Sequence, residues 1–175
     1  MNELTYNYNS ARSRKARLSI VLDVKWLRTL LLFVAIFSFV LWPVFVWVLQ
    51  LPLGHMLLLV AAAGVIPVAW YNGELKGLAP IGSVIGAKSL DDVLERKVLG
   101  RMNASLNPTT LSEIVMKLPG GIFFANRYGL SSSFIKNLSS DQASDLAAIW
   151  SKALELSTHV SDKELDASEL TAALL

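Results

Sequence analysis

The chain has 175 residues, of which 53% are hydrophobic and 17% are charged, and its mean hydropathy is +0.47. This composition is too apolar for an ordinary soluble domain and excludes a disordered chain. Sixteen basic and fourteen acidic residues leave a formal net charge of +2. The absence of cysteine excludes disulfides, thiol catalysis and cysteine-based zinc or iron–sulfur sites.

The N-terminal segment, residues 1–28, carries six basic residues against two acidic ones. Lys and Arg are enriched on the cytoplasmic side of membrane segments, so we expect this segment to stay in the cytoplasm. Its basic residues alternate with apolar ones. Two interpretations remain open for this pattern, namely contact with an anionic leaflet and a topology signal with no further role.

A long uncharged stretch follows, because no Asp, Glu, Lys or Arg occurs between Arg28 and Glu74. Its length suffices for two membrane crossings at about 20 residues each. Within residues 29–72 we expect transmembrane helices at 29–49 and 53–71, joined by a turn that contains glycine and proline. A signal peptide is disfavoured because the apolar core starts late and is long.

Two crossings would return the chain to the side from which it started. The predicted location is therefore the plasma (inner) membrane, as a multi-pass protein with both termini in the cytoplasm. A single crossing is the rival interpretation, since the second apolar half is weaker, and it would place the C-terminal region outside.

Aromatic and basic residues mark the ends of the two predicted helices. Trp26 and Arg28 precede the first helix, and Trp70 and Tyr71 close the second. Trp and Tyr concentrate at membrane–water interfaces. We expect all four residues to anchor the hairpin at one common interface, in preference to forming a lipid or ligand site.

Residues 73–88 hold four glycines and one proline and are expected to be a linker. Residues 89–175 show the spacing of short amphipathic helices and no strand-like alternation. The predicted fold class is therefore all-α: an N-terminal transmembrane helical hairpin followed by a small cytoplasmic helical domain.

The first two helices of this domain are predicted to run from Ser89 to about Gly100 and from Pro108 to Leu118. Capping boxes are expected at two pairs, Ser89 with Asp92 and Thr110 with Glu113. The residues expected on the buried faces are Leu90, Val93, Leu94, Val98, Leu111, Ile114, Val115 and Leu118.

Four further features complete the predicted helical domain. We expect a helix from Ile122 to Tyr128 that ends at a left-handed Gly129. A helix capped by the serines at 131–133 comes next, then one from 141 to 156, and a last one opened by Asp166 and Glu169. The residues expected to be buried in the middle two are Phe134, Ile135, Leu138, Leu146, Ile149, Trp150, Ala153 and Leu154.

The stretch TTLSEIVMKLPGGIFFANRYGLSSSFIKNL resembles the unit repeated in the N-terminal domain of Clp-type AAA+ unfoldases. That unit has a short apolar helix, a glycine break, a second helix that ends in a leucine or aromatic residue, a glycine and an apolar residue, and then another helix. The matching positions are Leu111, Ile114, Val115, Leu118, Gly121, Ala125, Tyr128, Gly129, Leu130, Ile135 and Leu138. Residues 141–175 resemble an incomplete second unit, in which Glu169 stands where the family has histidine.

The resemblance implies a fold of the Clp N-repeat type. It also implies partners: protein substrates or adaptors, with downstream AAA+ modules and a peptidase. We therefore expect a membrane-anchored substrate- or adaptor-binding region of a Clp-like ATP-dependent unfoldase, acting in protein quality control and proteolysis. The alternative is a stand-alone membrane scaffold or complex subunit, in which the small residues Ala61–Gly64 associate with other helices. Homo-oligomerisation is compatible with both.

The chain contains little that indicates catalysis. No GxxxxGK[ST] loop is present, so any ATP would bind downstream, and we expect no catalytic residue and no cofactor here. His55 and His159 share no helix face, which argues against a metal site. Ser157, His159 and Asp162 are too close in sequence for a triad. Nucleic-acid binding is not expected.

The best candidates for binding a protein are aromatic. Phe123, Phe124 and Tyr128 cannot all face the same way on one helix, so at least one is expected to be exposed beside the glycine break, where it can anchor a partner peptide. Packing in the core is the alternative role for these three residues.

Overall fold

The computed structural model describes residues 5–84, 87, 89–141, 146–160 and 164–175. The chain divides into a hairpin unit, Leu18–Leu78, and a helical domain, Met1–Arg17 with Ala79–Leu175. In the described ranges every regular element is helical, and the strand-like pairing found there is one bridge, between Leu94 and Leu165. The predicted all-α class is confirmed.

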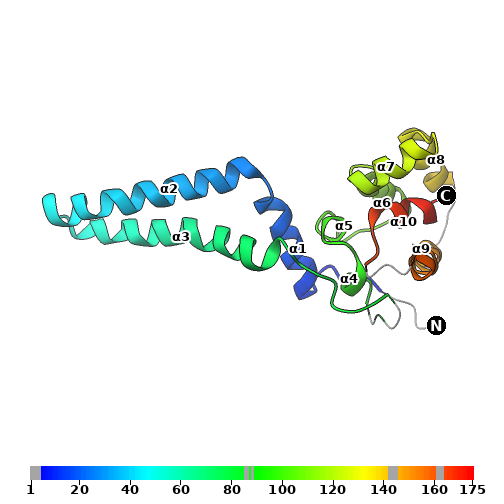
Figure 1. The fold of residues 1–175 in the computed structure, drawn as a ribbon, viewed down its shortest axis with the longest axis horizontal. Helices are drawn as coiled ribbons and strands as arrows, with labels where there is room; N and C mark the ends of the chain where they lie inside the picture. Colours follow the sequence, from blue (N-terminus) through cyan, green and yellow to red (C-terminus); the bar gives the residue numbers. More distant parts are fainter. Residues whose placement is uncertain (1–4, 85–86, 88, 142–145, 161–163) are drawn as a thin grey trace. The chain divides into compact units, whose positions relative to one another are not determined.

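The hairpin unit is built on two antiparallel helices, α2 (Lys25–Pro43) and α3 (Met56–Trp70), which lie side by side (Figure 1). A π-helical turn, Val44–Val48, extends α2. A 3-10 turn, Pro52–His55, precedes α3, and a π-helical turn, Tyr71–Leu75, extends it. The helices and their extensions form two continuous helical stretches, Lys25–Val48 and Pro52–Leu75. Each has 24 residues and is long and apolar enough to cross a membrane.

The turn between the two helices lies where the sequence predicts it. Gln50 has a φ of 53°, the left-handed region in which the chain can reverse sharply. The Leu51 N–H donates to the Phe45 carbonyl over 2.9 Å, and the Gly54 N–H donates to the Leu51 carbonyl over 2.9 Å. These bonds satisfy backbone groups that would otherwise be left open at the tip.

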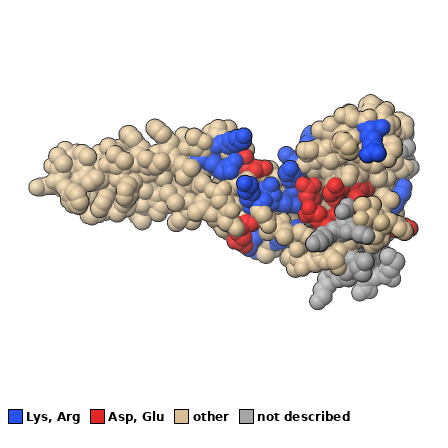
Figure 2. All heavy atoms as spheres, in the orientation of Figure 1, with Lys and Arg blue, Asp and Glu red and all other residues tan. Residues whose placement is uncertain are grey.

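The hairpin exposes its apolar surface instead of burying it. Only 11% of the most hydrophobic window in Lys25–Val48 is buried, and 22% of that in Pro52–Leu75, whereas a core helix of a soluble protein would be mostly buried. Figure 2 shows that the arm formed by α2 and α3 carries no charged side chain along most of its length. A surface of this kind suits hydrocarbon far better than water.

Small residues line the contact between the two helices. Ala35 and Ser38 of α2 and Ala61 and Gly64 of α3 are buried. A Cβ atom on Gly64 would lie 2.6 Å from the Leu31 carbonyl oxygen, so glycine is what allows this close approach. Close backbone contact through small residues is the usual basis of helix association in lipid.

The first helix, α1 (Ala11–Leu22), supplies residues to both units. The helical domain contains α4 (Leu90–Val93), α5 (Arg96–Leu99), α6 (Pro108–Val115) and α7 (Pro119–Arg127). Its remaining helices are α8 (Ser132–Asp141), α9 (Leu146–Val160) and α10 (Ala167–Ala173).

Helix α10 is the centre of the helical domain. It packs against α6, α7 and α9, while α8 packs against α6 (Figure 1). The fully buried side chains of this core include Leu111, Val115, Leu118, Ala153, Leu170 and Thr171. Three of these, Leu111, Val115 and Leu118, were predicted from the stripe of α6.

The prediction of one helix from Ser89 to Gly100 is wrong, because the chain is extended at Leu94 and Glu95. There the Glu95 N–H donates to the Leu165 carbonyl and the Leu165 N–H donates to the Val93 carbonyl, each over 2.8 Å. This pairing with a distant segment takes the backbone groups that a continuous helix would use. Ser89 also makes no capping bond.

The caps of α6 and α7 differ from those predicted. Asn107 caps α6, since its Oδ1 accepts from the Thr110 N–H over 2.7 Å, and Thr110 with Glu113 does not form the capping box. Helix α7 begins at Pro119, three residues earlier than expected, because proline has no N–H to lose in the first turn. Gly129, with a φ of 66°, ends α7 as predicted.

The later helices confirm some expectations and correct others. Ile135 is buried as predicted, whereas Phe134 is 50% exposed and was expected in the core; Leu138 lies outside the described side chains. Asp141, where the sequence predicts the next helix to start, belongs to α8; residues 142–145 lie outside the described residues, and α9 continues to Val160, four residues past its predicted end. The capping box at the start of α10 is confirmed.

Candidate functional site

The segment before the hairpin is part of the helical domain that follows the hairpin. The Leu90 N–H donates to the Thr5 carbonyl over 3.3 Å, and the Asn7 N–H donates to Oδ1 of Asp91 over 3.3 Å. The Ser89 hydroxyl donates to the same Thr5 carbonyl over 3.1 Å. Hydrogen bonds between residues more than eighty positions apart therefore attach the N-terminal segment to the region around α4.

Arg12 makes the most extensive of these contacts. Its guanidinium is buried, with Nε donating to the Ala79 carbonyl over 3.3 Å and Nη1 donating to the Asp91 carbonyl. Burial lowers the pKa of Arg12, and the nearby carboxylates of Glu164, Asp92 and Asp91 partly offset this effect. A buried, bonded arginine fixes the position of the segment that carries it.

Asp91 accepts hydrogen bonds both from the N-terminal segment and from the region around α4. Burial alone would raise the pKa of Asp91, but hydrogen bonds from the Ser10 and Ser89 side chains and from backbone N–H groups, that of Asn7 among them, outweigh burial and lower it. The carboxylate is thus held in its charged form by donors that stand on either side of the hairpin in sequence.

A second group of contacts orders the N-terminal segment itself. Arg17 donates from Nη1 to the Tyr8 carbonyl over 2.9 Å, and its guanidinium lies 3.7 Å from the centroid of the Tyr8 ring. The Ser13 hydroxyl donates to the Asn7 carbonyl over 3.0 Å. We name residues 5–17 the N-terminal clasp.

At the base of the hairpin, Tyr71 lies between two charged side chains. Tyr71 is 1% exposed, its hydroxyl donates to the Asp23 carboxylate, and the Arg28 guanidinium lies 4.5 Å from its ring centroid. Leu22 and Leu75 are buried around the same ring. The cluster joins the start of the first apolar helix to the end of the second.

The four residues predicted as interface anchors fall into two groups. Trp26 and Trp70 are exposed, and Trp70 donates from Nε1 to Oε2 of Glu74 over 2.6 Å. Arg28 and Tyr71 instead contact each other inside the hairpin base. Asp23 was not predicted, because its partner is distant in sequence; the signal available was an acid among the basic residues that precede the first apolar helix.

The three aromatic candidates on α7 also differ in environment. Phe123 and Tyr128 are exposed, whereas Phe124 is half-buried with its ring centroid 4.6 Å from that of Tyr128. Gly121 and Ala125 face the core, so the opposite side of α7 carries Phe123. The structure therefore leaves Phe123 available for contact with something outside the domain.

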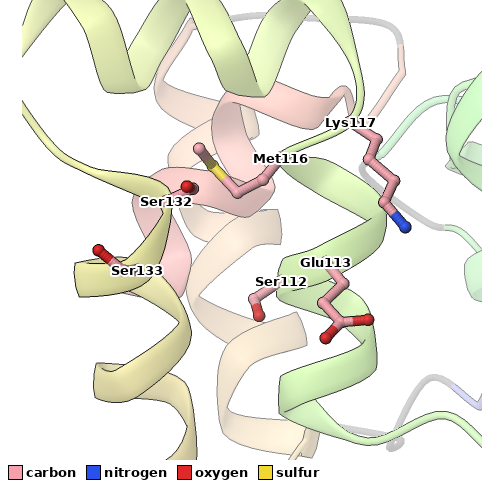
Figure 3. Close-up of a pocket in the computed structure, with 6 residues that line it drawn as sticks. All are labelled: Ser112, Glu113, Met116, Lys117, Ser132 and Ser133. Atoms are coloured by element: carbon pink, nitrogen blue, oxygen red, sulfur yellow. The ribbon is translucent and has the colours of Figure 1, made fainter.

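A groove of about 550 Å³ lies where α6 meets the start of α8 (Figure 3). Figure 3 shows the Met116 side chain extending toward Ser132. The residues that line the groove are Ser112, Glu113, Met116, Lys117, Ser132 and Ser133. They combine one apolar side chain with hydroxyls and one charge of each sign, a composition suited to a peptide. Sequence reasoning missed the groove because its two walls come from separate segments.

No family model, curated protein or solved structure matches this chain. The Clp-type repeat therefore stays a prediction based on residue pattern. Among the described residues, no group of three or more His, Asp or Glu side chains is placed to hold a metal ion. The features available for a functional argument are the apolar hairpin, the N-terminal clasp, the groove and the exposed face of α7.

Proposed function

We propose that this protein is a membrane-anchored helical domain that holds a protein-binding surface at the cytoplasmic face of the plasma membrane. The observation that carries the proposal is that the N-terminal clasp and residues 79–175 form one unit. These two parts flank the hairpin in sequence. If the hairpin enters a membrane, both flanks must lie on the same side, which a single crossing does not permit.

The charge of the N-terminal flank favours the cytoplasm as that side. Six basic residues precede the apolar stretch, and the turn at its far end carries no formal charge. Retaining Lys and Arg in the cytoplasm while an uncharged turn crosses is the arrangement that membrane insertion favours. Both termini of the chain would then be cytoplasmic.

For the helical domain we propose the substrate- or adaptor-binding role of a Clp-like unfoldase. The order of elements supports it: α6 is followed by α7, whose first turn contains Gly120 and Gly121 and which ends at the left-handed Gly129, and α8 comes next. The groove between α6 and α8 would receive a segment of a protein, with Met116 contacting an apolar side chain. ATP hydrolysis would belong to AAA+ modules outside these residues.

The scaffold alternative loses part of its basis. Ala61 and Gly64, two of the small residues considered for association with other proteins, are buried against α2 of the same hairpin. Ala62 and Ala63 alone of that group are exposed. Packing within the chain therefore explains two of the four small residues.

The topology is tested by single cysteines in this cysteine-free chain. We would place them at Asn9, at Glu155 and at Leu53 in the hairpin turn, all exposed positions. A membrane-impermeant maleimide added to intact cells should label Leu53→Cys and leave Asn9→Cys and Glu155→Cys unlabelled until the membrane is opened. Labelling of Glu155→Cys from outside would reject the proposal.

The partner is tested by photo-crosslinking from the groove in native membranes. A crosslinking amino acid at Met116 should capture an AAA+ ATPase subunit or a protein that such an ATPase degrades, whereas the same probe at Thr158, exposed on α9, should not. Crosslinks from Met116 to other membrane proteins alone would reject the Clp-like role and support the scaffold. Mass spectrometry of the products identifies the partner.

A further inference from the structure

The outer face of α7 exposes two large apolar side chains next to each other. Phe123 is 64% exposed, and Ile122, one position earlier, is also exposed. Arg127, one turn after Phe123, is exposed on the same side of the helix. Together these residues form what we call the α7 face: Ile122, Phe123 and Arg127.

The orientation of this face is fixed by Gly121 on the opposite side of α7. A Cβ atom on Gly121 would lie 2.3 Å from the Val115 carbonyl oxygen, so only glycine lets this side of the helix approach the core so closely. Turning α7 to bury Phe123 would break this contact. An exposed aromatic held in this way points to contact with another surface.

The segment of the chain that contains α7 carries charge of one sign. From Ile114 to Ser140 the chain contains basic residues and no acid. Residues 96–140 contain six basic residues and one acidic residue, Glu113. Residues 141–175 contain seven acidic and two basic residues. The α7 face therefore belongs to the basic part of a domain whose charges are separated along the sequence.

We propose that the α7 face binds the surface of an anionic lipid bilayer. Phe123 and Ile122 would enter the boundary between headgroups and acyl chains, and Arg127 would bond lipid phosphates. The helical domain resumes at Ala79, directly after the hairpin unit ends at Leu78, so a membrane that holds the hairpin is always present at high effective concentration. This inference goes beyond the proposed function, which concerns a protein in the groove, and it assigns Phe123 to lipid instead of to a partner peptide.

The test uses the full chain in nanodiscs of defined lipid. A polarity-sensitive dye is attached at Asn126→Cys, exposed on α7, so that Phe123 and Arg127 stay intact. In discs of phosphatidylcholine with phosphatidylglycerol the dye emission should shift to the blue, and in phosphatidylcholine alone it should not. The same dye at Glu155→Cys, exposed on α9, should report water in both lipids.

Charge and aromatic variants on the Asn126→Cys background complete the test. Arg127→Glu should weaken the response to phosphatidylglycerol by at least about fivefold for the lost basic contact. Arg101→Glu makes the same change at an exposed residue outside α7 and should have little effect. Phe123→Ser should abolish the shift, while Val160→Ser, also at a 64% exposed position, should preserve it.

Three results would overturn the proposal. They are no shift in either lipid, an equal shift in phosphatidylcholine alone, and a shift that appears only when soluble cell proteins are added, which would indicate a protein partner. Incorporation of the chain into discs reports separately on the hairpin, so a failure of membrane anchoring is distinguishable from a failure of the α7 face to bind.

Discussion

Gly64 lies so close to Leu31 that a Cβ atom at position 64 would stand 2.6 Å from the Leu31 carbonyl oxygen. The two apolar helices therefore meet backbone to backbone at this point. We predict that Gly64→Leu forces the helices apart and destabilises the hairpin by about 1–3 kcal/mol, as overpacking does. Thermal unfolding in detergent micelles, followed by circular dichroism, measures the loss.

The matched control for this substitution is Ala62→Leu. Ala62 lies on α3 but is exposed, so the added side chain meets no neighbouring helix. Its melting temperature should stay close to that of the parent protein. Equal destabilisation by both substitutions would show that helix contact at Gly64 is not the cause.

In the helical domain a second glycine, Gly121, allows a close backbone contact. Gly121 begins the close contact of α7 with Val115, whose carbonyl oxygen would lie 2.3 Å from an added Cβ. We predict that Gly121→Ala destabilises the domain by about 1–3 kcal/mol despite the smallness of the change. Gly82→Ala, in the same domain at a position with open space around it, should be nearly neutral. Unfolding of the two variants in the same detergent compares them directly.

Elements whose cause is local could be predicted from the sequence. The two apolar helices, the left-handed Gly129 and the capping box of α10 each depend on residues close in sequence, and all are present. The exposure of Phe134 was not predicted. The spacing of apolar residues indicates which side of a helix is apolar, but it does not indicate whether a neighbouring helix covers that side.

Features that depend on distant backbone pairing could not be predicted. The break between α4 and α5 comes from Leu165, and the N-terminal clasp is attached through the carbonyl groups of Thr5 and Asp91. Backbone carbonyls are the same in every residue, so such bonds leave no pattern in the sequence. The candidate site was therefore predicted only in its single residues, such as Phe123, and its grouping required the fold.

Tyr71 at the hairpin base offers a third test. Its hydroxyl donates to the Asp23 carboxylate, and Tyr71→Phe removes that donor while keeping the ring under Arg28. We predict a loss of about 1.5–3 kcal/mol in stability, the usual value of a hydrogen bond to a charged group. Tyr128→Phe removes a hydroxyl from an exposed ring and should cost nothing measurable. Denaturant titration of both variants in micelles provides the comparison.

Asp91 predicts a pH dependence of the attachment of the N-terminal clasp. Because hydrogen bonds lower its pKa in the folded protein, this carboxylate stabilises the fold above the unfolded Asp pKa of about 3.9. That contribution is lost as the pH falls below this value and through the lower folded pKa. Asp91→Asn should reduce stability at neutral pH and flatten the acid part of the stability profile. Glu155→Gln removes an exposed carboxylate on α9, away from the clasp, and is the control; a profile altered equally by both substitutions would contradict the assignment.

A substitution at Arg12 is the most direct test of the N-terminal clasp. Arg12 precedes the hairpin in sequence, and its guanidinium donates hydrogen bonds to the carbonyls of Ala79 and Asp91, which follow the hairpin. We predict that Arg12→Ala releases the clasp, so that the Leu90 amide, which donates to Thr5, exchanges its hydrogen at least about tenfold faster. Arg14→Ala removes the same charge from an exposed position two residues later and should leave this exchange unchanged. Hydrogen–deuterium exchange with mass spectrometry resolves the peptide that contains Leu90. Unchanged protection in Arg12→Ala would contradict the prediction and would mean that the hydrogen bonds between residues 5–7 and 89–91 hold the clasp without the arginine.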